Sequence, residues 1–553
     1  MTGAAARIAE LAERALRHGE LPERFNFARD VFDAWPAGDP AMLWVDDHGT
    51  RRRIAFGEFT ARSEGLARGL LGAGLQPGDA VLVVMPRLVE WWETSLACLR
   101  AGLVLSPGTT QLTAKDLAYR LQAADARAVI ADADAAARVD AALGSVAGAG
   151  RRPPALRVIV GGEREGWVCY RELCAVPGDF VAADTGPDDP ALLYFTSGTT
   201  GAPKMTLHTQ ASYGLGHVVT GRHWLGLRPG DLHWNLSDTG WAKAAYSSLF
   251  GPWAAGATVF VHHTPRFDPL ATLALLENEP ITTFCAAPTL YRLLVQQDLS
   301  SFQVPLLRHC AGAGEPLNPE VIAIWERATG LTIHDGYGQT ETVLLVGNAP
   351  GDEVAPGSMG RPMPGFDVAV IDDDGARRPV GEEGEVAVAL TPRRPVGLFR
   401  EYFRDPERTA EAFRGGWYRT GDRARVDADG RFWFVARSDD VITSSAYRIG
   451  PFEVESALLE HPAVVESAVV GKPDALRGQI VKAYVVLAPG HAGDDALVAE
   501  LQEFVRTHTA PYKYPREIEF VAELPKTVSG KIRRIELRER AAREPPRASG
   551  SPG

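Results

Sequence analysis

Hydrophobic and polar positions along the first third of the chain predict strands that alternate with helices. An apolar run at 81–85 is followed by an amphipathic stretch at 87–100, a short apolar run at 103–105, a helical pattern from 113 and an apolar run at 126–131. Short apolar runs fit buried strands, and apolar positions three to four residues apart fit one face of a helix. This alternation predicts an α/β unit, and we expect a second one after the loop at 144–154.

The pattern changes in the second half of the chain. Between 367 and 433, short β-like segments are separated by Asp- or Glu- and Gly-rich turns at 372–375, 381–384 and 427–430. Such turns join antiparallel strands, so this stretch predicts a small β-barrel-like subdomain. The turns lack the ligand spacing of a calcium loop, and we assign them no metal. Later segments predict an α+β unit, with a helix near 452–460, strands at 464–470 and 483–487, and a helix ending near 507.

These patterns divide the chain into domains. The fold class is α/β, with two α/β subdomains and the β-barrel-like subdomain in an N-terminal region at 1–438 and a small α+β domain at 439–540. The segment 541–553 is rich in Pro, Gly, Ser and Arg, which predicts a disordered tail.

Composition excludes several classes of function. At 553 residues and 45% hydrophobic content, the chain can bury the cores of several domains. Its net charge of -12 argues against binding to nucleic acid or to anionic membranes. A run of about 18 apolar residues is absent, so we expect no membrane insertion. The cysteines lack C-x-x-C spacing, which predicts reduced thiols and no zinc site at Cys98, Cys169, Cys174, Cys285 and Cys310.

The first thirty residues bear on location. They mix Glu and Asp with Arg and lack a continuous apolar stretch, which argues against a signal peptide or a transit peptide. On that basis we expect a cytoplasmic protein.

A loop after an apolar strand carries the strongest chemical signal. Residues 194–204 read Tyr-Phe-Thr-Ser-Gly-Thr-Thr-Gly-Ala-Pro-Lys. The hydroxyls can donate hydrogen bonds, the glycines let backbone N–H groups approach an anion, and Lys204 adds a cation. The spacing is not that of a Walker A loop. It predicts a polyphosphate-binding loop of another type, and the alternative is a flexible polar loop with an incidental lysine.

Further motifs follow this loop in order. They are Asp-Gly-Tyr-Gly-Gln-Thr-Glu at 335–341, Tyr-Arg-Thr-Gly-Asp at 418–422, Arg-Ser-Asp-Asp-Val at 437–441 and Pro-Lys-Thr-Val-Ser-Gly-Lys at 525–531. With the loop, this ordered set resembles the adenylate-forming superfamily. The segments 107–113, 237–241 and 510–516 resemble those of medium-chain acyl-CoA synthetases. The resemblance extends from about Phe25 to Arg538.

The resemblance implies an ATP-dependent carboxylic acid:CoA ligase that forms AMP. A carboxylate is a poor electrophile, and transfer of AMP to its oxygen gives it a good leaving group. The implied cofactors are ATP, Mg2+ and CoA, and the implied partner is a small-molecule acid, medium-chain fatty or aromatic. A homo-oligomer is compatible with the sequence.

The resemblance also assigns nucleotide-binding residues. Asp422 is implied to accept hydrogen bonds from the ribose hydroxyls and Tyr337 to lie against adenine, although alone they could close a turn and fill a core. Lys531 is implied to bridge the acid and ATP, and an exposed lysine is its alternative. The implied ATP- or AMP-binding residues are Thr196, Ser197, Gly198, Thr199, Thr200, Gly201, Ala202, Pro203, Lys204, Gly314, Glu315, Pro316, Asp335, Gly336, Tyr337, Gly338, Gln339, Thr340, Asp422, Arg437 and Lys531. Those implied to be catalytic are Lys531, Thr340, Glu341 and Lys204, with Glu341 also the Mg2+ ligand.

Other residues are assigned to the acid, to CoA and to a domain movement. By resemblance, the small domain rotates about Asp439 so that a second site forms for the thiol. The implied CoA-binding residues are Ser445, Ala446, Tyr447, Arg448, Arg477, Arg506, Tyr514, Pro515 and Arg516. The implied acyl pocket contains Thr239, Gly240, Trp241, Ala311, Gly312 and Ala313, and Trp241 could equally be a core aromatic residue.

One position departs from the family pattern. Ala446 stands where the family has glycine, and its methyl group could narrow the passage for the pantetheine arm. The alternative is therefore an adenylating enzyme that passes the activated acid, or another oxyanion such as nitrite, to a nucleophile other than CoA. The arginines at 477, 506 and 516 favour CoA. An adenylate-binding sensor without turnover is a further alternative, which Lys531 and Glu341 disfavour.

Overall fold

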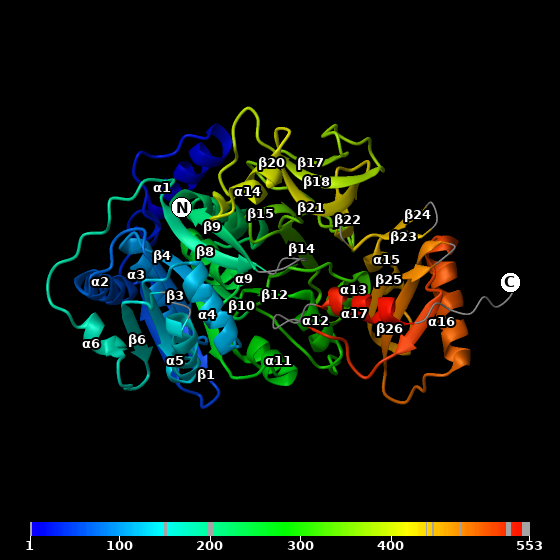
Figure 1. Cartoon of the computed structure of the whole chain (residues 1–553), viewed down its shortest axis with the longest axis horizontal. Coiled ribbons are helices and arrows are strands. Elements are labelled where there is room, and N and C mark those ends of the chain that lie inside the picture. Colours follow the sequence, from blue (N-terminus) through cyan, green and yellow to red (C-terminus); the bar gives the residue numbers. More distant parts are fainter. Residues whose placement is uncertain are drawn as a thin grey trace.

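The computed structural model describes residues 3–148, 152–196, 203–437, 440–444, 447–474, 477–526 and 532–544. Within them, the N-terminal region contains two α/β sheets and a β half-barrel, and a small α+β domain follows (Figure 1). The predicted fold class is confirmed. In this part of the chain, no helix has the length and apolarity needed to cross a membrane.

The first sheet comes from the alternating segments at the start of the chain, with the order β19-β9-β8-β4-β3-β5-β6-β7. Its strands are β3 (Ala80–Val84), β4 (Val104–Gly108), β5 (Ala128–Asp132), β6 (Leu156–Val160), β7 (Val168–Cys169), β8 (Pro190–Thr196), β9 (Lys204–Thr209) and β19 (Glu401–Tyr402). Its helices are α2 (Phe56–Gly72), α3 (Val89–Arg100), α4 (Ala114–Ala123), α5 (Ala133–Gly148) and α6 (Tyr170–Cys174). Thr113 and Asp116 form the predicted capping box of α4.

A second sheet has the order β16-β15-β14-β13-β12-β10-β11-β1-β2. Its strands are β1 (Pro40–Asp46), β2 (Arg51–Ala55), β10 (Leu232–Leu236), β11 (Thr258–His263), β12 (Thr283–Ala286), β13 (His309–Ala313), β14 (Ile333–Gly338), β15 (Leu344–Gly347) and β16 (Arg361–Pro362). The helices of this part are α7 (Gln210–Gly214), α8 (Gly216–Val219), α9 (Ala242–Ala245), α10 (Gly251–Ala255), α11 (Pro269–Asn278), α12 (Pro288–Val295) and α13 (Pro319–Thr329), and α1 (Gly3–Glu13) precedes both sheets. Short π-helical segments lie at Arg14–His18, Ala28–Phe32, Thr220–Trp224 and Tyr246–Phe250.

The half-barrel is the predicted β-barrel-like subdomain. It consists of β17 (Val368–Ile371), β18 (Glu383–Ala389), β20 (Phe413–Arg414), β21 (Trp417–Val426) and β22 (Phe432–Arg437), beside α14 (Pro406–Ala412). The Gly375 N–H donates to the Asp372 carbonyl at 3.1 Å, which closes one predicted turn. A continuous apolar core joins this subdomain to the α/β units.

The small domain has an apolar core of its own. Its strands are β23 (Ile442–Ser444), β24 (Tyr447–Ile449), β25 (Val464–Asp474), β26 (Gly478–Leu487) and β27 (Glu517–Phe520), and its helices are α15 (Pro451–Leu459), α16 (Asp495–His508), the 3-10 turn Pro511–Lys513 and α17 (Arg534–Arg543). A separate core allows this domain to move without disrupting the first one.

The first residues of the expected tail, 541–544, belong to the folded small domain. Helix α17 continues to Arg543, and Ala541 is fully buried. Glu544 then pairs with Lys472 at 2.8 Å and with Lys482 at 2.5 Å. These contacts hold the end of the helix on the sheet, a tertiary effect that composition does not reveal.

Candidate active site

Strands β13 and β14 bring two predicted segments together. They run parallel, with Gly312 opposite Asp335 and Ala313 opposite Gly336. A Cβ atom at Gly336 would lie 2.6 Å from Cε2 of Trp224, so glycine is needed for this close packing. The carboxyl ends of parallel strands are where α/β sheets bind ligands.

Asp422 on β21 lies at the centre of a polar cluster. Its Oδ2 accepts hydrogen bonds from the Tyr337 hydroxyl at 2.7 Å and from Gln339 Nε2 at 2.6 Å. Arg437 Nε lies 3.8 Å from Oδ1. Burial raises the pKa of Asp422, while the charge of Arg437 opposes this rise. The cluster therefore fixes the Asp422 carboxyl group.

Gln339 is itself fixed by the half-barrel. Its Nε2 also donates to the Thr420 carbonyl at 2.9 Å, and its Oε1 accepts from the Tyr418 hydroxyl at 2.7 Å. The nitrogen and the oxygen of the amide group each have a defined partner, so the orientation of the group is fixed. The segment after β14 is in this way attached to β21.

Thr340 and Glu341 lie next to the first sheet. His208 Nε2 is 2.7 Å from the Thr340 carbonyl, and the Tyr402 hydroxyl donates to Glu341 Oε1 at 2.8 Å. Burial lowers the pKa of His208 to about 3, so this imidazole is neutral and donates to the carbonyl. Lys204 Nζ lies 5.0 Å from the centroid of the Tyr402 ring. The structure therefore brings Lys204 and Glu341 to the same place.

Most of the predicted phosphate loop, Ser197, Gly198, Thr199, Thr200, Gly201 and Ala202, lies outside the described residues. Its two ends are paired, with Thr196 opposite Lys204 across β8 and β9. Pro203 accepts a hydrogen bond from Tyr119 at its carbonyl oxygen, at 3.2 Å. The loop is thus closed at its base, beside Tyr402.

The oxygen atoms in this corner fit Mg2+, a hard ion that prefers oxygen ligands. Tyr402 holds one oxygen of Glu341, and within the described residues no hydrogen bond or ion pair to the other, Oε2, is found. The Thr196 hydroxyl is buried and also has no hydrogen-bond partner within that part of the chain. Glu341 and Thr196 are the residues that could hold the ion or its water ligands.

Asp335 and Lys243 lie near the end of β13. Burial raises the pKa of Asp335 to about 8, although a hydrogen bond from the Gly336 N–H and the charge of Lys243 oppose the rise. Lys243 Nζ donates to the Ala313 carbonyl at 3.0 Å. This arrangement orders the edge that contains the predicted acyl-pocket residues Ala311, Gly312 and Ala313.

Glu315 is held by α12. It accepts hydrogen bonds from the Thr289 hydroxyl and, at 3.0 Å, from Arg292 Nη2. The preceding Gly314 has a φ of +111°, a conformation that favours glycine. Gly314, Glu315 and Pro316 therefore form an ordered turn directly after β13.

The loop that contains Trp241 packs on another predicted segment. The Thr239 hydroxyl donates to the Met85 carbonyl at 2.6 Å, and a Cβ atom at Gly240 would lie 2.2 Å from Thr109 N. Two segments that resemble those of medium-chain enzymes, 107–113 and 237–241, are thus in contact. Trp241 is half-buried, and its indole nitrogen has no hydrogen-bond partner in the part of the chain that the structure describes.

The predicted CoA-binding residues lie on the small domain. Tyr447 is 50% exposed and stacks on Tyr512, with centroids 4.1 Å apart. The Arg516 guanidinium lies 4.9 Å from the Tyr514 ring centroid, and Arg506 pairs with Glu503 at 2.7 Å on the surface. Tyr447 and Arg506 are exposed, whereas Tyr514 and Arg516 are partly buried.

The remaining CoA-binding candidates are less informative. Arg477 is exposed at the turn between β25 and β26, and its N–H donates to Asp474 Oδ1 at 2.8 Å. The Pro515 carbonyl accepts a hydrogen bond from Gln502 at 3.0 Å. Outside the described residues lie Asp439, Ser445, Ala446, Lys531 and the side chain of Arg448.

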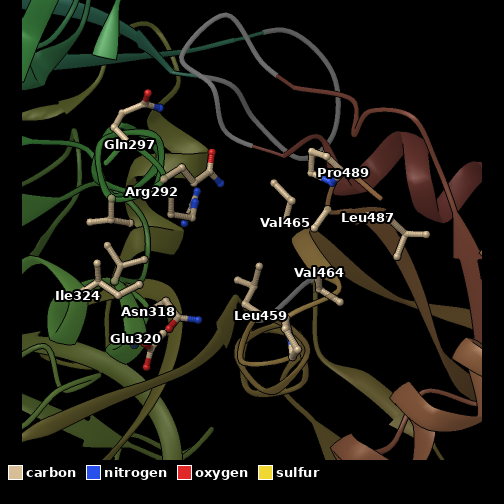
Figure 2. Close-up of a pocket in the computed structure, with 15 residues that line it drawn as sticks. Arg292, Gln297, Asn318, Glu320, Ile324, Leu459, Val464, Val465, Leu487 and Pro489 are labelled. Atoms are coloured by element: carbon tan, nitrogen blue, oxygen red, sulfur yellow. The ribbon is translucent and has the colours of Figure 1, made fainter. Parts of the chain in front are cut away.

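A cleft of about 670 Å³ separates the two domains. Figure 2 shows residues of α12, of α13 and of its N-cap on one wall, with Arg292, Asn318 and Glu320 as polar groups beside the apolar Ile324. The opposite wall is apolar and comes from the small domain, with Leu459, Val464, Val465, Leu487 and Pro489. Arg292 also contacts Glu315, so the cleft adjoins the predicted nucleotide segment.

Arg534, at the start of α17, connects the small domain to this region. Burial lowers its pKa, but the negative charge and hydrogen bonds of Glu455 raise it overall, and the charges of Asp440 and Glu315 add to that effect. Its Nη2 lies 2.7 Å from Glu455 Oε2. The helix that follows Lys531 in sequence thus faces the N-terminal region.

Sequence reasoning missed several residues of the site. Tyr402, Tyr418 and His208 make the contacts to Glu341, Gln339 and Thr340. Tyr402 gave no local signal, and Tyr418 was seen only as the first residue of a motif, because the partners of both are distant in sequence. His208 could have been found, since it follows Lys204 by four residues on a strand and so lies on the same face.

Comparison with known proteins identifies close relatives. The chain is 52% identical to "Acyl-coenzyme A synthetase ACSM3, mitochondrial" of Mus musculus, over 94% of this chain and 91% of that protein. It is 50% identical to "Acyl-coenzyme A synthetase ACSM5, mitochondrial" of Homo sapiens, with the same coverage of both chains.

These relatives correct the expected location. The prediction of a cytoplasmic protein is wrong, because the relatives are named as mitochondrial, which points away from the cytoplasm. The expectation rested on the composition of the first thirty residues. Composition and fold therefore do not report the compartment.

A solved structure and two family models agree with these relatives. The crystal structure of the anthranilate CoA ligase AuaEII with anthranoyl-AMP has a TM-score of 0.86 to this chain and 31% sequence identity, covering 95% of this chain and 98% of that one. The AMP-binding enzyme model matches residues 29–403, and the model of the C-terminal domain of AMP-binding enzymes matches residues 453–531. The first match alone spans more than half of the sequence, and the chain belongs to the AMP-binding enzyme family.

Proposed function

We propose that the protein is an ATP-dependent carboxylic acid:CoA ligase that forms AMP and acts on a medium-chain fatty or aromatic acid. The names of its relatives, acyl-coenzyme A synthetases, support this activity. The solved neighbour is a CoA ligase with an acyl-adenylate bound, which supports the same two-step reaction.

In the proposed first step, a carboxylate oxygen of the acid attacks the α-phosphorus of ATP. The bond from the α-phosphorus to the bridging oxygen breaks, and pyrophosphate leaves with the electron pair. Lys204 and the loop that begins at Thr196 bind the β- and γ-phosphates, and Lys531 interacts with the charge on the reacting oxygens. When bound at Glu341, Mg2+ supplies positive charge for the same phosphates.

The cluster around Asp422 is the observation that carries this proposal. Tyr337 and Gln339 both donate to one oxygen of Asp422, so its orientation is fixed before a ligand arrives. Arg437 lies beside the other oxygen. A buried, oriented carboxyl group suits the two hydroxyls of a ribose, and Thr340 and Glu341 follow in the same segment.

In the proposed second step, the thiolate of CoA attacks the acyl carbon and AMP leaves. We assign the delivery of CoA to the small domain, where the arginines at 477, 506 and 516 face its phosphates. The separate core of that domain and the open cleft beside α12 support a rotation about Asp439.

The acid is proposed to bind between the Trp241 loop and the end of β13. Gly312 and Ala313 are small residues at the end of β13, and the Trp241 ring offers an apolar surface. Thr239 and Gly240 shape this loop through their contacts with Met85 and Thr109. An aliphatic chain and an aromatic ring both fit this chemistry.

A panel of acids tests the proposal. The purified protein is incubated with ATP, Mg2+ and each acid, with and without CoA, and AMP, pyrophosphate and the CoA thioester are quantified. We expect one AMP and one pyrophosphate for each thioester, with the highest kcat/KM for medium-chain or aromatic acids. If AMP is released at the same rate with and without CoA, the activated acid is passed to another acceptor. Release of ADP would refute the proposal.

A further inference from the structure

We propose that Tyr402 is a positioning residue for both phosphate-binding side chains, Glu341 and Lys204. Its hydroxyl orients the Glu341 carboxylate, and its ring holds the Lys204 ammonium group. The inference rests on the proposed function, because it gives Glu341 and Lys204 their roles toward Mg2+ and ATP.

The backbone places Tyr402 between the two partners. Strand β19 pairs with β9, with Tyr402 opposite Thr206. Lys204 is two residues before Thr206 on β9, so the two side chains lie on the same face. The Tyr402 side chain is therefore held at the first residues after the phosphate loop.

The contacts of Tyr402 differ for each partner. Its hydroxyl donates to Glu341 Oε1 at 2.8 Å, and the Lys204 Nζ lies 5.0 Å from its ring centroid. The first contact is a hydrogen bond to a carboxylate, which is stronger than one between neutral groups. The second lies within the range of a cation–π interaction.

Tyr402 is itself rigid. The residue is 5% exposed, and its ring centroid lies 4.7 Å from that of Phe399. Its backbone N–H donates to Thr409 Oγ1 at 3.0 Å. The Tyr402 hydroxyl is the donor in this contact, because a carboxylate oxygen can only accept. A fixed donor on Oε1 leaves Oε2 to face a metal ion.

This arrangement predicts an effect on Mg2+-dependent binding. A residue that orients a metal ligand changes metal affinity by about 10- to 100-fold when it is replaced. A residue that only fills the core changes stability and has no specific effect on the metal. Nucleotide binding with and without Mg2+ distinguishes the two roles.

The experiment measures ATP binding by isothermal titration calorimetry, with no acid present, in Mg2+ and in EDTA. Tyr402→Phe removes the hydroxyl and keeps the ring. We expect about 10-fold weaker ATP binding in Mg2+ and an unchanged affinity in EDTA. Tyr402→Leu also removes the ring beside Lys204, and we expect weaker binding under both conditions.

Tyr170→Phe is the matched control. The Tyr170 hydroxyl donates to a carboxylate oxygen of Glu93 at 2.9 Å and is buried, but it lies outside the proposed site. We expect this variant to bind ATP like the wild type in both conditions. Equal effects of Tyr402→Phe and Tyr170→Phe would overturn the positioning role.

If Tyr402→Phe also lowers the stability of the fold, a double-mutant cycle with Glu341→Gln still separates the two roles. Glu341→Gln removes the charge that Tyr402 orients, so Tyr402→Phe in that background should cause less than a twofold further change in Mg2+-dependent affinity. An unreduced effect would contradict the mechanism. Pyrophosphate exchange by the wild type tests the proposed function separately, because the binding measurement requires no turnover.

Discussion

The proposed nucleotide site and the proposed CoA surface are built in different ways. Asp422 is buried and Gln339 is partly buried, and each is held by internal hydrogen bonds. Arg506 has an exposed ion pair with Glu503, and Tyr447 is half exposed. The first site is organised before its ligand binds. The polar groups of the second surface are hydrogen-bonded to water in the free protein, so a ligand must displace that water and order the side chains.

The largest expected effect separates the two steps of the reaction. Lys531→Ala removes the cation proposed to stabilise the adenylation transition state, and we expect about a 1000-fold loss of adenylate formation. Thioester formation from preformed acyl-adenylate should change by less than about threefold, since the small domain would have moved Lys531 away.

Lys526→Ala is the control, because Lys526 lies on the same segment and pairs with Glu466 at 2.6 Å. It should leave both steps intact. Pyrophosphate exchange measures the first step, and acyl-CoA formation from synthetic adenylate measures the second. Equal losses in both steps for Lys531→Ala would refute the division of roles.

The next largest effect is expected for Asp422→Asn, which should impair both steps. Asp422→Asn replaces the acceptor proposed for the ribose, which is present in ATP and in the acyl-adenylate alike. We expect kcat/KM for ATP to fall about 100-fold, the range expected for loss of hydrogen bonds to a charged group. Asp427→Asn is the matched control, because Asp427 holds a turn of the half-barrel through Trp433 at 2.8 Å. A loss confined to the first step would argue against ribose binding.

The contrast also explains what sequence could predict. Apolar alternation predicted the first sheet, and Thr113 with Asp116 predicted the start of α4, because these are local effects. The ordered motifs indicated Asp422 and Glu341 as site residues. The contact of Tyr402 with Glu341 was not predictable, since it joins residues 61 positions apart and requires β19 to pair with β9.

The pH dependence of stability sharpens the comparison further. The pKa of Asp335 is raised to about 8 by burial, so the folded protein keeps a proton that the unfolded chain releases near pH 4. The folded state then binds more protons between pH 4 and 8, and this residue makes the free energy of unfolding fall as pH rises. The slope is at most about 1.4 kcal/mol for each pH unit.

Asp335→Asn should flatten that slope between pH 5 and 8, because the amide cannot release a proton. Chemical denaturation at several pH values measures the free energy of unfolding directly. Asp298→Asn is the control, since hydrogen bonds from Ser300 lower the pKa of this exposed carboxyl group and it has no proton to release in that interval. An unchanged slope for Asp335→Asn would place the proton on another group.

The smallest effect is expected on the CoA surface. Arg506→Ala should raise the KM for CoA by about three- to tenfold and leave pyrophosphate exchange unchanged, because the arginine is proposed to contact only phosphates of CoA. The effect should shrink at high salt, where interactions between exposed charges are screened. Arg543→Ala removes a comparable exposed arginine of the same domain, paired with Glu539 at 3.5 Å, and should leave the KM unchanged. If both variants raise the KM equally, the surface acts through its general charge. If Arg506→Ala alone raises it, the sparse contacts of this surface still define a specific site.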